Sequence, residues 1–170
     1  RKAARETPER TDIWLSLGEL QWKRGARRDA KRSYERALEH DPTLAVAHRR
    51  IGEAELADDD FRDAEKSLRE ALKKEGNRAE THYLMAAALF RQGKTDEALP
   101  FAEKSLDLDS GPAESWKLAG EIYSSKNQKI KAENAYTEYA RRKPNDPAGQ
   151  LVLGSMQLEK GDFKEASATL

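Results

Sequence analysis

The chain has 170 residues, of which 31 are Lys or Arg and 31 are Asp or Glu, so its formal net charge is zero although 36% of its residues are charged. Nonspecific binding to nucleic acid depends on excess positive charge, so this balance argues against a nucleic-acid partner. The absence of Cys excludes disulfides, thiolate zinc sites and a cysteine nucleophile, and the longest strongly apolar run, LMAAALF, is too short to cross a bilayer.

The sequence repeats itself with a period of 34 residues. Positions one period apart form columns of similar residues. Four such columns are Trp14, His48, His82, Trp116 and Gln150; Leu17, Ile51, Met85, Ala119 and Leu153; Gly18, Gly52, Ala86, Gly120 and Gly154; and Ala30, Ala64, Ala98, Ala132 and Ala166. Five copies in one phase predict a repeat architecture over essentially the whole chain.

The first ten residues, RKAARETPER, contain no aromatic or branched apolar residue. Ala3 and Pro8 lie one period before Ala37 and Pro42, so residues 1–10 are interpreted as the end of the second helix of a preceding repeat. On this interpretation the chain is a fragment of a longer array. A tag or a disordered basic tail is the alternative.

Residues 11–25, TDIWLSLGELQWKRG, are predicted to form the first helix of a pair. Residues 28–40, RDAKRSYERALEH, are predicted to form the second. The packing stripe of the first helix follows helical spacing and comprises Trp14, Leu17, Gly18 and Gln21. The second helix is amphipathic about Ala30, Tyr34, Ala37 and Leu38. The small columns that begin at Gly18 and Ala30 are expected to face each other, which would let the two helices approach closely.

Two further columns mark where the helices end. The turn column, within each pair, holds only residue types that tolerate a left-handed backbone: Gly25, Asp59, Gly93, Asn127 and Gly161. The break column, between pairs, holds Pro42, Gly76, Ser110 and Pro144. The pattern therefore predicts a tight turn inside each pair and an interruption before the next.

The pattern Trp14, Leu17, Gly18, Ala30, Tyr34, Ala37 and Pro42, recurring at 34 residues, resembles the tetratricopeptide repeat family. This resemblance implies an all-α fold, an α-solenoid in which helix-turn-helix repeats wind into a right-handed superhelix. It also implies an inner groove lined by the first helix of each pair. The copies are expected at residues 11–44, 45–78, 79–112, 113–146 and, truncated, 147–170.

The sequence offers no motif for catalysis: it has no Gly-rich phosphate loop, no nucleophile motif and no metal-binding spacing such as HExxH. His48 and His82 share a column, which allows a metal pair between adjacent repeats. However, both occupy a column that holds Trp in other copies, and two neutral ligands make a poor site, so packing is the favoured interpretation. We therefore expect no enzyme activity, no cofactor and no metal site.

A second stripe on each first helix, offset from the packing stripe, is the candidate partner-binding surface. By the family resemblance, this stripe lines the inner groove. Trp22, Tyr83 and Phe90 would grip a bound segment, and charged residues would orient it. The candidate residues are Leu15, Glu19, Trp22, Arg49, Glu53, Leu56, Tyr83, Ala87, Phe90, Lys117 and Glu121. Alternatively, Arg49–Glu53 and Lys117–Glu121 are ordinary ion pairs within a helix, and neighbouring helices cover the rings.

One binding mode of the family is not expected. Chaperone-binding members hold a C-terminal carboxylate with a Lys, Asn, Asn, Lys and Arg clamp spread over three repeats. The matching positions in the first three copies are Leu15, Glu19, Arg50, Glu80 and Leu84, and the two later frames fail as well. Glutamates at these positions would repel a carboxylate.

The resulting expectation is a non-catalytic interaction scaffold that binds a peptide or helix of a partner protein in its groove. One alternative is a structural or self-assembly segment of a larger repeat protein, with self-association through its apolar stripe. Another is a regulatory or targeting region of an enzyme whose catalytic domain lies outside these residues. Fold alone does not choose among these alternatives.

Overall fold

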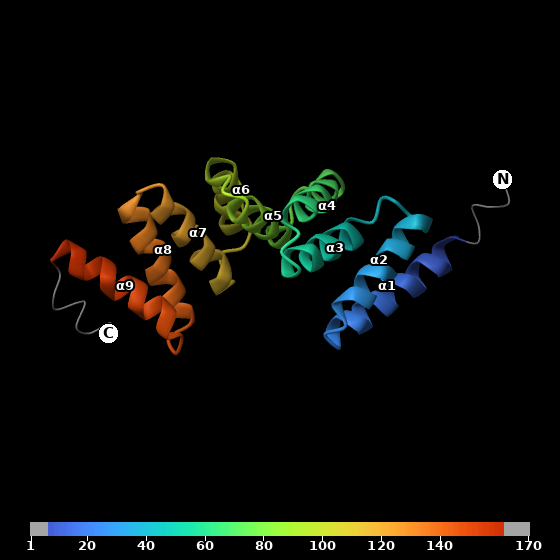
Figure 1. Ribbon diagram of the computed structural model, residues 1–170, viewed down its shortest axis with the longest axis horizontal. Coiled ribbons are helices and arrows are strands. Elements are labelled where there is room, and N and C mark those ends of the chain that lie inside the picture. Colours follow the sequence, from blue (N-terminus) through green and yellow to red (C-terminus); the bar gives the residue numbers. More distant parts are fainter. Residues whose placement is uncertain (1–6, 162–170) are drawn as a thin grey trace.

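The computed structural model describes residues 7–161, which form a stack of consecutive α-helices (Figure 1). The helices are α1 (Thr7–Lys23), α2 (Arg27–His40), α3 (Ala45–Ala57), α4 (Phe61–Lys74), α5 (Ala79–Arg91), α6 (Thr95–Leu108), α7 (Ala113–Ser125), α8 (Lys129–Arg142) and α9 (Pro147–Lys160). Within this range there is no β-strand. None of these helices is both long and apolar enough to cross a bilayer.

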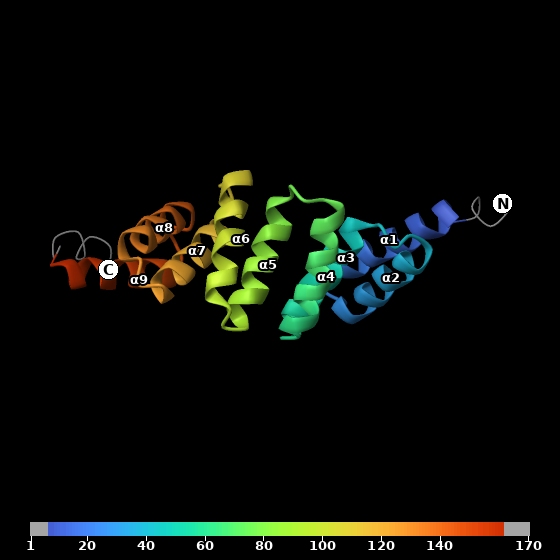
Figure 2. The same cartoon turned by 90° about the horizontal axis from the view of Figure 1, so that it is seen from above.

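The helices pack in sequential pairs, α1 with α2, α3 with α4, α5 with α6 and α7 with α8. Each second helix then packs against the first helix of the next pair, so that the pairs follow one another along the long axis (Figure 2). The first helices α3, α5 and α7 also touch in succession. The predicted all-α solenoid is therefore confirmed.

The first helix starts earlier than its equivalents. Residues 7–10 correspond, one period on, to the break at 41–44, yet they are helical and continuous with α1. Pro8 does not stop this helix because a proline in the first turn lacks only an N–H that would have no partner within the helix. Residues 7–10, which the sequence pattern assigned to a preceding second helix, therefore belong to α1. Residues 1–6 lie outside the described residues, as do 162–170, which include most of the second helix expected for the fifth copy.

The turn column has the predicted backbone in all five copies. The φ angles are +75° at Gly25, +62° at Asp59, +77° at Gly93, +56° at Asn127 and +85° at Gly161. At Gly25 the amide N–H donates to the carbonyl of Trp22 at 2.9 Å, which closes the turn after α1. The left-handed residue reverses the chain so that the second helix runs back along the first.

Side chains of the Trp and His column hydrogen-bond to the segment that connects one helix pair to the next. The ring Nε1 of Trp116 donates to the carbonyl of Ser110 at 2.8 Å. His48 and His82 place Nε2 at 3.0 Å and 2.8 Å from the carbonyl oxygens of Pro42 and Gly76, also six residues earlier. An imidazole N–H can thus replace the indole N–H, which explains why His and Trp share this column and supports the packing interpretation of both histidines.

The glycine column lies closest to a larger side chain than the one expected. A Cβ built on Gly18 would lie 2.6 Å from the Tyr34 ring, and one on Gly52 would lie 2.6 Å from Cγ of Leu68. The small residue therefore mainly makes room for the large side chain of the second helix. The expected approach to the Ala30 column is present as well at Gly52, where the added Cβ would lie 3.3 Å from the carbonyl oxygen of Ala64. A bulky side chain lying across a glycine fills the space that two small residues would leave empty.

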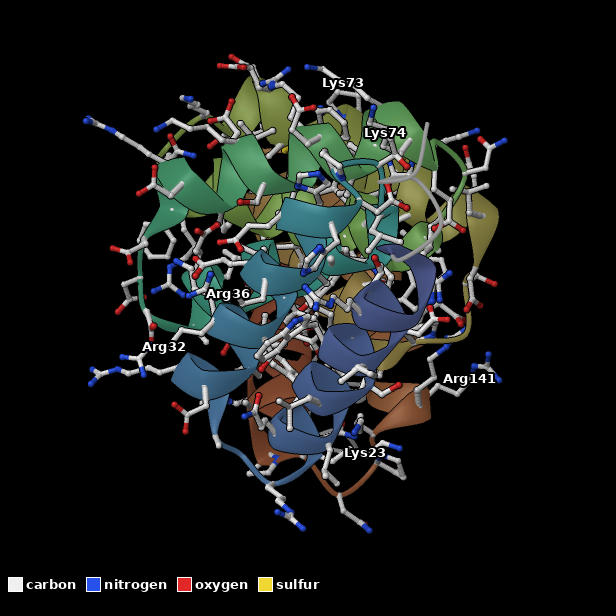
Figure 3. The ribbon with its side chains drawn as sticks, turned by 90° about the vertical axis from the view of Figure 1, so that its right-hand side faces the viewer. Lys23, Arg32, Arg36, Lys73, Lys74 and Arg141 are labelled. Atoms are coloured by element: carbon white, nitrogen blue, oxygen red, sulfur yellow. The ribbon has the colours of Figure 1, made fainter. Side chains whose placement is uncertain are left out.

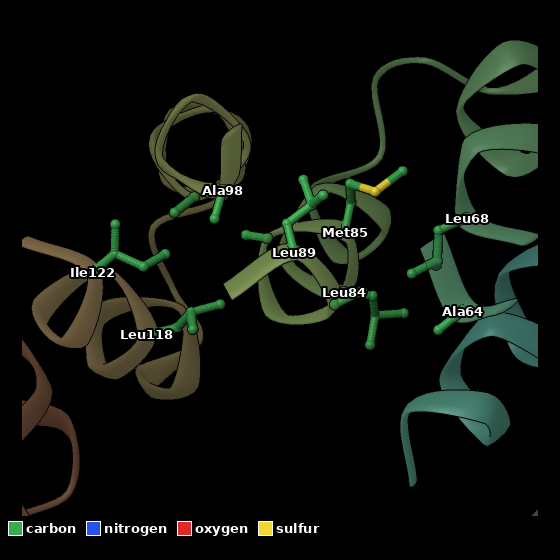
Figure 4. Close-up of a cluster of buried hydrophobic side chains, with 11 residues drawn as sticks. Ala64, Leu68, Leu84, Met85, Leu89, Ala98, Leu118 and Ile122 are labelled. Carbon is green, nitrogen blue, oxygen red and sulfur yellow. The ribbon is translucent and has the colours of Figure 1, made fainter. Parts of the chain in front are cut away.

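A continuous buried core runs through the middle pairs from α4 to α7. Figure 4 shows Leu68 of α4 and Met85 of α5 on one side, and Leu89 of α5 facing Ile122 of α7 on the other. Leu68, Met85 and Ile122 are 0% exposed. Charged side chains surround this core, and Figure 3 shows cations at the edges of the stack, among them Lys23, Arg32, Arg36, Lys73, Lys74 and Arg141.

Polar contacts also link successive pairs. Glu65 of α4 accepts hydrogen bonds from Nζ of Lys94 at 2.7 Å and from Nε2 of Gln92 at 3.0 Å, across to the turn between α5 and α6. Arg69 adds a bond at 2.6 Å from within α4. The hydrogen bond from Lys94 is the largest influence on this carboxyl, and together these donors lower the pKa of Glu65 to about 2.

Replacing Gly52 by Ala should destabilise the fold by about 1–3 kcal/mol, because the added methyl group meets the fully buried Leu68 and cannot be accommodated without repacking. Urea unfolding at neutral pH measures this loss. Gly76→Ala is the matched control: its nearest neighbour would be 3.5 Å away and its φ is not left-handed, so a change within about 0.5 kcal/mol is expected. Equal losses in the two variants would contradict the packing described here.

The Glu65 contacts should make stability depend on pH. Since the folded-state pKa is depressed from 4.5 to about 2, the stabilisation is complete above the unfolded value and is lost as pH falls from about 5 towards 2. Glu65→Gln should be less stable than the wild type by about 1–2 kcal/mol at pH 7, and the gap should close on acidification. Urea unfolding from pH 7 to pH 3 tests this, with Glu39→Gln, which removes an exposed carboxylate from α2, as the control substitution.

Candidate functional site

The candidate residues lie on the side of the stack where α3, α5 and α7 meet, which we call the first-helix face. None of the eleven is fully exposed. Ten are half-buried, and Arg49 is buried, with 3% of its surface exposed. The candidate stripe is thus partly an interface between repeats.

Arg50 gathers three of the candidate residues into one cluster. Its Nε lies 3.0 Å from Oε1 of Glu19, and its Nη1 lies 2.8 Å from Oε2 of Glu53. The guanidinium also lies over the ring of Trp22, with its carbon 5.5 Å from the ring centroid. Glu19 further accepts a hydrogen bond at 3.0 Å from the hydroxyl of Tyr34.

The Arg50 cluster shifts the acid–base properties of its members. Partial burial alone would raise the pKa of Glu19, but the hydrogen bond and charge of Arg50 outweigh it, so the pKa lies below its ordinary value. Burial and the bond to Glu19 raise the pKa of Tyr34. The cluster therefore links the first two pairs as an ionised network.

Arg49 does not face an open groove as expected. Its Nη1 forms an ion pair with Oε2 of Glu80 on α5 at 2.7 Å, although neither Nη1 nor Nε makes a hydrogen bond within the described part of the chain. Burial lowers the pKa of Arg49, although the charge of Glu80 opposes the shift. Glu53 pairs with Arg50 and not with Arg49. The ion pair of Arg49 with Glu80 instead joins α3 to α5.

Lys117 and Glu121 also depart from the expected pairing within one helix. Nζ of Lys117 lies 5.8 Å from the centroid of the Tyr139 ring on α8. No ion pair joins it to Glu121 among the contacts of residues 7–161. The hydroxyl of Tyr139 donates to Asp146, so Lys117 approaches a ring that is itself anchored between α8 and α9.

Most of the apolar candidates support the core rather than line an open surface. Leu56, Ala87 and Phe90 pack against the cluster that runs from α4 to α7. Leu15 and Trp22 pack against the buried residues shared by α2 and α3. The interpretation in which neighbouring helices cover the rings therefore describes Trp22 and Phe90 better than the interpretation as open anchors.

Tyr83 packs against the same cluster as Phe90, but it also borders a pocket of about 250 Å³ between α5 and α7. The apolar walls come from Tyr83, Ala79 and Pro112. Three carboxylates, Ser105 and Ser115 complete the lining; the carboxylates are Glu80, Asp109 and Glu114. Burial raises the pKa of Tyr83, and the charged groups that raise it further are all carboxylates, those of Glu114, Glu121 and Glu53.

Three of the residues that organise this face were absent from the candidate set: Arg50, Glu80 and Glu114. A sequence signal for them exists, because first helices meet between positions 31 residues apart. Glu19 pairs with Arg50 and Arg49 pairs with Glu80 at this separation. A search for opposite charges at i and i+31 would have found both pairs.

Within residues 7–161, no group of three acidic or histidine side chains is placed to hold a metal ion. The arrangement offers ion pairs between helices and one partly apolar, acidic pocket. Such a surface can bind a side chain, and it shows no nucleophile activated by a neighbouring base.

Comparison with protein-family models gives matches described as tetratricopeptide repeat, at residues 11–44 and at residues 49–113 and 119–170. A comparison with curated protein sequences finds no match. Together the family matches cover most of the chain.

Solved structures agree in fold. MamA 41-end from Desulfovibrio magneticus RS-1 is 21% identical, with a TM-score of 0.82, and the match covers 96% of this chain and 92% of that one. PilF of Pseudomonas aeruginosa is 20% identical, with a TM-score of 0.82, over 96% of this chain and 75% of that one. YrrB, described as a TPR protein with an unusual peptide-binding site, is 18% identical, with a TM-score of 0.79, over 99% and 87%. At such identities the likeness establishes the fold alone.

Arg50→Gln should lower the free energy of unfolding by about 1–2 kcal/mol at neutral pH, because it leaves the carboxylates of Glu19 and Glu53 without their cation. Arg36→Gln is the matched control, since its pair with Glu39 is exposed and is expected to contribute less than about 0.5 kcal/mol. Urea unfolding of both variants measures the difference. Similar small losses would mean that the Arg50 cluster does not stabilise the stack.

Proposed function

The chain belongs to the tetratricopeptide repeat family, and on that premise we propose that it is a non-catalytic scaffold that binds a segment of a partner protein on its first-helix face. The observation that carries the proposal is the pocket beside Tyr83. The peptide-binding site in the description of YrrB, a relative in fold, supports the same kind of function.

The chemistry of the pocket favours a segment with a Lys or Arg side chain. The ring of Tyr83 and the walls formed by Ala79 and Pro112 suit the aliphatic stem of such a residue. Its charged end would meet the carboxylates at the rim. Glu80 is held by the buried Arg49 and also lies near Arg50 and Arg78, at 3.7 Å and 3.6 Å, whereas the ion pair of Glu114 is an exposed one, with Lys143 at 3.3 Å. A bound cation could therefore replace Lys143 at little cost.

Fewer of the eleven candidate residues would contact the partner segment than the sequence alone suggested. The Arg50 guanidinium lies over the Trp22 ring, and Phe90 packs on the core without lining the pocket, so neither is proposed as an anchor. Tyr83 remains as the central contact, with Glu53 and Glu121 contributing to the negative potential around its hydroxyl. The charged residues of the first three pairs would then serve mainly to hold neighbouring helices together through ion pairs.

A positional-scanning peptide library should show the preference. Bound to the wild-type chain, it should be enriched at one position in Lys or Arg over Glu by at least threefold, because the pocket is acidic. Glu114→Gln and Tyr83→Leu should each weaken a selected peptide by threefold or more, as measured by fluorescence anisotropy. Tyr83→Leu keeps an apolar side chain in place and so preserves the packing on the core.

Glu70→Gln, on α4, removes a carboxylate away from the pocket and should leave peptide affinity within about twofold of the wild type. All variants need helicity and melting equal to the wild type. A selected peptide that binds Tyr83→Leu and Glu114→Gln as tightly as the wild type would place binding elsewhere. A library that yields no enriched position would remove the support for peptide recognition on this face.

A further inference from the structure

Helix α1 exposes an apolar stripe that none of the other described helices covers. Ile13 is 62% exposed, Leu17 36% and Leu20 45%. The three residues follow the spacing of one helix face. Exposed arginines, Arg10 and Arg24, continue the same face at its two ends. We call these five residues the α1 stripe.

The same columns are buried in later first helices. One period after Ile13, Leu17 and Leu20 lie Ala47, Ile51 and Ala54 of α3, which are 0%, 6% and 1% exposed. The next equivalents on α5 are Thr81, Met85 and Ala88, and those on α7 are Ser115, Ala119 and Ile122; none exceeds 5% exposure. The second helix of the preceding pair packs on each of these faces, α2 on α3, α4 on α5 and α6 on α7.

From this continuity we propose that the α1 stripe binds an amphipathic helix of a partner protein, lying antiparallel to α1 as each second helix lies on the following first helix. The stripe is the same interface that the chain builds three times within α2 to α7. The proposal concerns a different surface from the pocket beside Tyr83 and does not depend on it.

The internal interfaces also indicate the chemistry of the partner helix near its start. Arg24 shares a column with Asp58, Gln92 and Lys126, and the last two show how a polar or cationic residue there is paired. Lys126 forms an ion pair with Asp96 in the first turn of α6, and Gln92 donates to Glu65 of α4 at 3.0 Å. An acidic residue in the first turn of the partner helix would meet Arg24 in the same way, and it would also interact favourably with the helix dipole.

Near its end, the partner helix should carry a small residue. In the column of Ile13, Ser115 meets Ser105 of α6 with the two hydroxyls 3.5 Å apart, and Gly149 lies against the ring of Tyr139. The two facing residues thus share a limited space. Because Ile13 is large, an Ala or Gly opposite it would satisfy this limit.

One observation disfavours a second copy of α1 as the occupant, and another disfavours a helix joined to α1 by the usual short break. An antiparallel pairing of two α1 stripes would bring Arg10 of one copy towards Arg24 of the other, and like charges disfavour this arrangement. In addition, residues 7–10 continue α1 where 41–44 and 75–78 form the breaks that lead a second helix into the next first helix. The described backbone therefore extends along α1 and does not turn back across the stripe.

The test uses a capped synthetic peptide of residues 60–75, which contains α4, with Arg62→Asp to supply the first-turn acid. Titrated into the wild-type chain, it should shift the methyl NMR signals of Ile13, Leu17 and Leu20. The Ile13→Glu, Leu20→Glu double variant should weaken binding at least tenfold. Ile13 is 62% and Leu20 45% exposed, and neither belongs to a buried cluster, so the variant should keep its helicity and melting temperature.

Two controls isolate the stripe. Ile130→Glu changes an isoleucine on α8 that is 73% exposed, and it should leave the affinity within twofold. The same peptide with the native Arg62 should bind at least threefold more weakly, since its cation would face Arg24, and this difference should shrink at high salt.

Shifts confined to the α1 stripe, lost in the double variant, would support the proposal. No binding at millimolar peptide would overturn it. Sedimentation of the chain without peptide gives the other test. A wild-type dimer together with a monomeric double variant would also overturn the proposal, because a second copy would then cover the stripe.

Discussion

Burial of the first helices α3, α5 and α7 between two second helices is the interaction on which the rest of this structure depends. Met85 and Leu89 illustrate it: they lie on α5, and their burial requires α4 on one side and α6 and α7 on the other. A single helix pair could not remove both faces from water. Hydrophobic burial is the dominant favourable contribution to folding, so the stack is stable only as a stack. The left-handed turns and the ring-to-carbonyl hydrogen bonds hold the helices at the spacing that this burial needs.

Much of the fold could be predicted from the period alone. The helices follow from apolar spacing, and the turns follow from columns that contain only Gly, Asp or Asn, because few other residues adopt a positive φ without strain. The side chain that faces Gly18 was harder to predict from the sequence. Tyr34 and Ala30 lie on the same face of one helix, one turn apart, and only the relative shift of α1 and α2 decides which of them meets the glycine.

The candidate site was harder to predict for a similar reason. Arg49 and Arg50 are neighbours in sequence, but successive residues on a helix point about 100° apart, and the small tilt between α3 and α5 decides which guanidinium is buried. Glu80 lies 31 residues after Arg49 rather than 34, so a comparison of equal columns does not bring them together. Contacts between the first helices of neighbouring repeats join residues 31 positions apart. The sequence columns compare residues 34 positions apart and so indicate only contacts that recur in every repeat.

The buried residues fall into separate clusters along the stack, one around α2 and α3, a larger one from α4 to α7, and one around α7 and α8. A molecule organised in this way has no single core whose loss unfolds everything at once. Opening at either end exposes one cluster and leaves the larger one intact, so the ends should exchange their amide hydrogens through partial opening while α5 exchanges only when the middle comes apart. The array therefore unfolds as a series of cooperative units that differ in stability. A ligand that contacts two clusters would couple the unfolding of one to that of the other.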